Sequence, residues 1–154
     1  MFKRCELGWA FIFAAFAAVC LAGADSKEPW TKTEIITPAE LTRELSAAPA
    51  GKIILIHVGF RTLYNQGRIP GSQYAGPGSK AEGLAALRKL VEKNPRNQMI
   101  VIYCGCCPWQ ECPNIRPAFQ ELKQMGFTNL KVLELPDSLV TDWVGKGYPI
   151  SRGN

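Results

Sequence analysis

The chain has 154 residues, of which 20% are charged, and its formal net charge is +5 at pH 7. This length allows one domain and leaves little room for a second. The Lys and Arg residues form no cluster of the kind that binds nucleic acid or a membrane surface, so neither partner is expected. A mildly basic chain favours small anionic substrates.

The first residues have the pattern of an export signal. Lys3 and Arg4 give a positive start, residues 7–22 are almost wholly apolar, and Ala22-Gly23-Ala24 supplies small residues for signal peptidase. The apolar run is shorter than the roughly 20 residues that a membrane-spanning helix needs. We therefore expect residues 1–24 to be a cleaved signal peptide. The protein is then exported (periplasmic or secreted), with no membrane attachment after cleavage.

This segment has two alternative fates. It can remain uncleaved as an anchor, or it can be lipidated at Cys20, although Val19 is bulky where a small residue usually precedes a lipidated cysteine. Cleavage is the better interpretation, and it lowers the net charge from +5 to +4.

Cysteines are concentrated in one place. Of the six in the chain, Cys5 and Cys20 lie in the predicted signal peptide, and the other four fall close together. In an oxidising compartment, spread-out cysteines would indicate disulfide staples, but four in one loop cannot brace a whole domain. The sequence therefore predicts local chemistry at Cys104, Cys106, Cys107 and Cys112.

After the signal peptide we expect an irregular arm at 25–32 and one domain at 33–154. Its first helix should begin at Pro38, because Thr37 can cap it and Glu40 stands three residues after the cap. Two wholly apolar runs are typical of strands that are buried on both faces. In chain order, the expected strands cover 33–36, 52–58, 72–75, 99–103 and 130–135, and the later helices cover 81–93, 117–125 and 139–146.

Strands that alternate with helices indicate an α/β fold with a parallel sheet covered on both faces. Ligands of such sheets bind at the carboxyl ends of the strands. Cys104 directly follows the buried strand 99–103 and begins a loop that leads into a helix. Its position alone makes it the first candidate for an active-site residue.

Five motifs follow one another in a recognisable order: Ile36-Thr37-Pro38-Ala39-Glu40-Leu41, Gly67-Arg68-Ile69-Pro70-Gly71, Tyr103-Cys104, Leu122-Lys123-Gln124-Met125-Gly126-Phe127 and Trp143-Val144-Gly145-Lys146-Gly147-Tyr148-Pro149-Ile150. In this order they resemble the rhodanese (sulfurtransferase) family over nearly all of the predicted mature chain. The resemblance implies a rhodanese-like parallel five-stranded sheet with helices on both faces. It also implies that Cys104 is the nucleophile.

In that family the cysteine thiolate accepts a sulfane sulfur, becomes a persulfide and passes the sulfur to a thiophilic acceptor. The resemblance thus implies a sulfurtransferase acting on a small sulfur-containing anion, or on thiol and persulfide donors and acceptors, including a thiol of a partner protein. No cofactor is expected. The thiolate needs a lowered pKa, which a helix N-terminus capped by Asn114 and the charge of Arg116 over the same pocket can supply.

Two further residues have competing interpretations. His57 is the only histidine and stands at a strand end, where it acts as a proton acceptor near Cys104 or serves as hydrogen-bonded structure. Trp109 lies within the loop, where it shields the sulfur or presents the loop to a partner.

The loop departs from the family pattern. It is about five residues longer than the common six-residue loop, and it adds three thiols. We therefore expect the family's fold in this chain but not its standard thiosulfate-to-cyanide reaction. Cys104-Gly105-Cys106-Cys107 is also a Cys-x-x-Cys, the spacing of thiol–disulfide exchange proteins. Cys107 or Cys106 can then resolve an intermediate on Cys104, or Cys112 can pair with either to brace the loop.

A third alternative is a metal site. Four thiolates can bind zinc, but zinc ligands are usually spaced much further apart than these. A soft ion such as Cu(I) with fewer ligands suits the loop better. The domain is then a non-catalytic binding module that holds either a metal ion or a structural disulfide, with Cys104, Cys106, Cys107 and Cys112 as the candidate ligands.

Overall fold

The computed structural model describes residues 28–153. The predicted signal peptide at 1–24 and the first three residues of the expected arm lie outside this range. Within it, no helix is both long enough and apolar enough to span a membrane.

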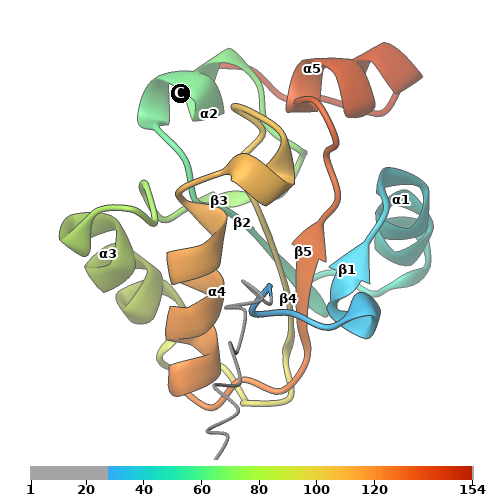
Figure 1. The fold of residues 1–154 in the computed structure, drawn as a ribbon. Coiled ribbons are helices and arrows are strands. Elements are labelled where there is room, and N and C mark those ends of the chain that lie inside the picture. Colours follow the sequence, from blue (N-terminus) through green and yellow to red (C-terminus); the bar gives the residue numbers. More distant parts are fainter. Residues whose placement is uncertain (1–27, 154) are drawn as a thin grey trace, which may run out of the picture.

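A single five-stranded sheet forms the centre of the fold, and all its pairings are parallel. The strand order is β1-β5-β4-β2-β3, which places β4 in the middle (Figure 1). This confirms the predicted α/β architecture. The strands are β1 (Ile35–Ile36), β2 (Ile53–His57), β3 (Gln73–Tyr74), β4 (Met99–Tyr103) and β5 (Leu130–Leu133).

The two faces of the sheet carry separate cores because side chains alternate along each strand. On β4, Ile100 and Ile102 join one core, while Val101 and Tyr103 join the other. The first core is covered by α3 (Ala81–Val91) and α4 (Ile115–Gln124), and the second by α1 (Pro38–Ala47) and α5 (Leu139–Asp142) (Figure 1). Helices therefore cover both faces, as predicted.

The predicted start of α1 is confirmed by its hydrogen bonds. The hydroxyl of Thr37 accepts from the backbone N–H of Glu40 at 3.3 Å, and the Glu40 carboxylate accepts from the N–H of Thr37 at 2.9 Å. Pro38 occupies the first helical position, where its missing N–H is no loss.

Several predicted boundaries were wrong. The first strand is only two residues long because Lys32–Glu34 forms the 3₁₀ turn η1, and α4 begins at Ile115, two residues earlier than expected. The predicted helix 139–146 is broken into α5 and η3 (Val144–Lys146), where Gly145 weakens helix propensity. The short helix α2 (Arg61–Gln66) was not predicted, since it has no buried residue and thus no apolar stripe.

The expected arm is docked against the domain by Trp30. Its ring lies 5.3 Å from that of Trp109 in the cysteine loop and 5.6 Å from that of Phe119 on α4, measured between centroids. Trp30 is 6% exposed and Trp109 is 5% exposed. Trp109 therefore anchors the loop from inside, and it is not an exposed residue that presents the loop to a partner.

Phe119 tests this packing because it is fully buried between the arm, the loop and the sheet. Replacing Phe119 by Ala should lower the free energy of unfolding by about 3–5 kcal/mol, through lost burial and an unfilled cavity. Val140→Ala, at a position that is 71% exposed, should stay within about 0.5 kcal/mol. Urea denaturation of both variants measures the difference, and equal midpoints would contradict the described core.

Candidate active site

The site lies where β2 and β4 end side by side. Their register pairs His57 with Tyr103, and the N–H of Val58 donates to the Tyr103 carbonyl at 2.9 Å, so the segment after β2 runs next to Cys104. Cys104 opens the loop between β4 and α4. Two backbone bonds fasten this loop to the rest of the domain, Trp109 N–H to Leu135 at 3.0 Å and Leu139 N–H to the Gly105 carbonyl at 3.2 Å.

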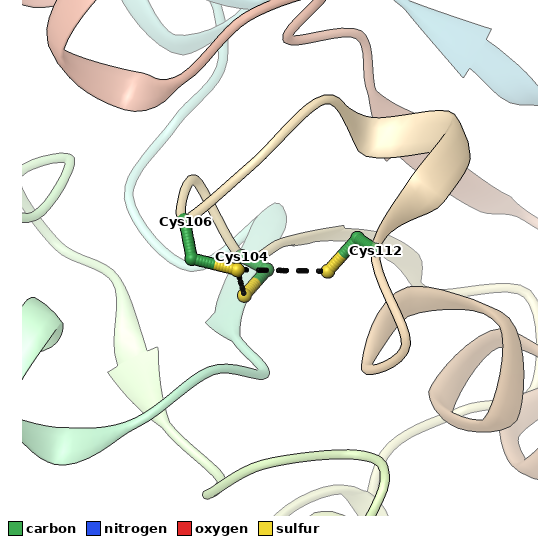
Figure 2. A group of neighbouring side chains, drawn as sticks. All are labelled: Cys104, Cys106 and Cys112. Carbon is green, nitrogen blue, oxygen red and sulfur yellow. Dashed lines mark hydrogen bonds between the residues drawn. The ribbon is translucent and has the colours of Figure 1, made fainter.

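The sulfur of Cys104 is the centre of this site. The residue is 1% exposed, and its Sγ lies 3.3 Å from Sγ of Cys106 (Figure 2). Nδ2 of Asn114 donates to it at 3.5 Å. Asn114 is fully buried and is held in place by Ser79, whose N–H and hydroxyl both donate to Oδ1, at 3.1 and 2.8 Å. Asn114 occupies the N-cap position of α4 but makes no side-chain cap bond, because its amide is used between Ser79 and Cys104.

Two glycines that sequence reasoning missed shape the space around the sulfur. A Cβ at Gly59 would lie 2.6 Å from Cys104 Sγ, closer than real contacts allow. Gly105 has φ of +78°, and a Cβ there would meet Leu139 at 2.6 Å. The only sequence signal for Gly59 is that it directly follows the predicted strand 52–58.

His57 is buried as a neutral side chain. Its Nδ1 accepts from the N–H of Gly59 at 3.2 Å, which assigns the proton to Nε2. Burial lowers the pKa of His57 to about 4, although the backbone carbonyl of Cys104 opposes this shift. Nε2 makes no hydrogen bond of acceptable distance and angle in the described residues. This arrangement favours a donor to a bound ligand over a proton acceptor, which was one of the two interpretations from the sequence.

The sulfur that is best placed to ionise belongs to Cys112. Its pKa is lowered to about 5, because the neighbouring Cys104 thiol and the backbone N–H groups of Asn114 and Ile115 favour its thiolate. The neighbouring Cys112 sulfur, together with burial, raises the pKa of Cys104. Burial and a bond with Cys106 raise the pKa of Cys107 to about 12. The N-terminus of α4 therefore stabilises a negative charge on Cys112. From the sequence we expected it to stabilise the thiolate of Cys104.

Arg116 does not line this pocket. Its guanidinium pairs with the Glu28 carboxylate at 2.5 and 3.0 Å, also donates to the Gln110 carbonyl, and lies 5.7 Å from the ring of Trp30. It thus ties the arm to the cysteine loop.

A small pocket of about 140 Å³ opens beside Cys104. Its charged lining residue is Arg152, which sequence reasoning missed because it belongs to the C-terminal tail. The tail is held by paired backbone bonds of 2.9 Å between Arg68 and Ser151. Apolar walls and one cation suit a small anion. The other lining residues are His57, Leu63, Gln66, Gly67, Gly105, Leu139, Val140, Val144 and Ile150.

The thiols could also hold a soft metal ion. All four are free, and the Sγ atoms of Cys104, Cys106 and Cys112 lie within 4.8 Å of one another. Three sulfurs at this spacing are compatible with metal–sulfur bonds of about 2.3 Å around one ion. Cys107, with Sγ 3.2 Å from that of Cys106, is the nearby candidate for a fourth ligand.

Known proteins match both the sequence and the fold. The rhodanese-like domain family matches residues 37–135, more than half of the chain. The chain belongs to the rhodanese-like domain family. No match is found among curated proteins.

Solved structures share the rhodanese fold at low identity. A Bacillus halodurans protein has 19% identity and a TM-score of 0.59, with 77% of this chain and 76% of that one covered. The rhodanese-like domain of an Anabaena protein has 20% identity and a TM-score of 0.56, covering 77% and 79%. The thiosulfate sulfurtransferase of Pseudomonas aeruginosa has 19% identity and a TM-score of 0.60. The match spans 82% of this chain and 20% of that larger one.

The rhodanese-like site should contain a thiolate at neutral pH. In the reduced protein, ultraviolet thiolate absorbance should rise as the pH passes through about 5, because Cys112 loses its proton there. Cys112→Ser should move this step to higher pH, while Cys107→Ser, which removes only the smallest of the interactions that lower the pKa of Cys112, should move it less. A reduced protein that shows no thiolate below about pH 8, the range of an ordinary thiol, would contradict the described hydrogen bonds.

Proposed function

We propose that this protein is a sulfurtransferase that carries a sulfane sulfur as a persulfide on Cys104. The observation that carries the proposal is the place of Cys104 Sγ, at the carboxyl end of β4 and on the wall of a small pocket with a cationic residue. Family membership and the fold shared with a thiosulfate sulfurtransferase support it.

The reaction needs Cys104 in its deprotonated form, and a neighbouring cysteine can accept its proton. A thiolate is the nucleophile, and the Cys104 thiol donates to the sulfur of Cys106, with the Cys112 sulfur within 4.8 Å. When the donor binds, Cys104 passes its proton along its hydrogen bond to Cys106, and the Cys104 thiolate attacks the sulfane sulfur. With thiosulfate, the S–S bond of the donor breaks, sulfite leaves with the bonding electron pair, and Cys104 keeps the outer sulfur as a persulfide.

The donor is a small anion or a low-molecular-weight persulfide. The pocket volume of about 140 Å³ limits its size, and Arg152 attracts its charge. The Nε2–H of His57, which lacks a partner, can donate to an anionic oxygen of the bound donor. Residues 1–24 support export, and so we place this activity in the periplasm or outside the cell.

Sulfur loading tests the proposal directly. Reduced protein incubated with thiosulfate and then separated from it should retain one added sulfur on the Cys104 peptide, or should have released that sulfur as sulfide. Cys104→Ser should show neither product, because the attacking thiolate is gone. Mass spectrometry of peptides and a sulfide assay measure both. A wild-type protein that yields neither would overturn the proposal.

The role of Arg152 predicts an effect on donor binding. Arg152→Gln should raise the KM for thiosulfate about fivefold at low salt, the upper end for an exposed charge. Arg43→Gln removes the same charge from the exposed side of α1 and should leave KM unchanged. Steady-state rates measure both variants, and equal KM values would remove Arg152 from the donor site.

A further inference from the structure

The closest neighbour of the Cys104 sulfur is another thiol. Sγ of Cys106 lies 3.3 Å away, and Gly105, with φ of +78°, turns the chain between the two residues so that both sulfurs point into the same space (Figure 2). Cys107 is one step further out, with Sγ 3.2 Å from that of Cys106. The geometry thus selects Cys106, and not Cys107, as the partner of Cys104.

The two thiols differ in access. Cys104 is 1% exposed, whereas Cys106 is exposed. A persulfide on Cys104 would be bounded by Gly59 and Asn114 and would face a pocket of about 140 Å³. The thiol of a partner protein cannot enter a space of that size, because it comes with its own backbone. An acceptor thiol inside the protein is already in contact.

We infer that Cys106 resolves the persulfide on Cys104, so that the sulfane sulfur leaves as sulfide and a Cys104–Cys106 disulfide remains. This inference rests on the proposed function and adds the fate of the transferred sulfur. The two sulfurs must approach from 3.3 Å to the disulfide length of about 2.05 Å. A turn centred on glycine allows this movement, since Gly105 has no side chain to restrict its dihedral angles.

The step balances in atoms and electrons. The Cys106 sulfur attacks Sγ of Cys104, a bond forms between them, and the bond from Sγ to the outer sulfur breaks. The outer sulfur leaves as HS⁻ with the bonding pair and takes up the proton that Cys106 gives up. Two thiols are oxidised by two electrons, and the sulfane sulfur is reduced to sulfide.

The oxidised protein needs an external reductant to act again. A low-molecular-weight thiol or a dithiol protein can attack the exposed Cys106 sulfur, form a mixed disulfide there and release the Cys104 thiol. A second thiol then releases Cys106. Over one cycle the protein converts thiosulfate and two thiols into sulfite, sulfide and a disulfide.

A single-turnover experiment tests this inference. Fully reduced protein, freed of other thiols, is mixed with thiosulfate, and sulfide is measured while peptides are mapped for disulfides. Wild type should release about one sulfide per chain and gain a Cys104–Cys106 disulfide. Cys106→Ser should release sulfide more than roughly tenfold slower, since the intramolecular attack is lost, and should retain the sulfur on Cys104. Cys107→Ser is the matched control and should behave as wild type.

The outcomes of this experiment distinguish a failure of the inference about Cys106 from a failure of the proposed function. Wild type that retains the sulfur on Cys104 and releases no sulfide overturns the inference but not the proposed function. The same holds if Cys106→Ser releases sulfide at the wild-type rate, or if the disulfide joins Cys104 to Cys107 or Cys112. If Cys106→Ser takes up no sulfur, the proposed function fails and the inference fails with it.

Discussion

The parallel pairing of β2 with β4 is the constraint on which the site depends. It aligns His57 with Tyr103 and therefore brings the turn after β2 beside Cys104. The sulfur then lies so close to Gly59 that no Cβ fits between them. Every other feature of the site, including the amide of Asn114 and the sulfur of Cys106, is arranged around this one fixed position.

Around this position several cysteines lie in different environments. Cys112 accepts hydrogen bonds from backbone N–H groups at the start of α4, which favour its thiolate. Cys104 faces the pocket. Cys106 contacts both, at 3.3 Å from Cys104 and 4.0 Å from Cys112. In the proposed sulfur transfer, the enlarged loop supplies Cys106 as an internal acceptor.

Sequence patterns predicted the sheet well because buried parallel strands are continuous apolar runs, and β2 and β4 have this pattern. They also predicted that Cys104 lies at a strand end. They failed where geometry depends on contacts that are distant along the chain. Arg116 was expected over the pocket, yet its partner is Glu28, 88 residues away, and the pocket cation Arg152 is brought in by the tail. No local pattern encodes either contact.

The most direct test of the account is a crystal structure of the Cys106→Ser variant, reduced and soaked with thiosulfate. This variant should retain the transferred sulfur because it lacks the internal acceptor. The account predicts density for one extra sulfur bonded to Sγ of Cys104, extending into the pocket toward His57 and Arg152. An extra sulfur on Cys112 or Cys107, with Cys104 unmodified, would contradict the account.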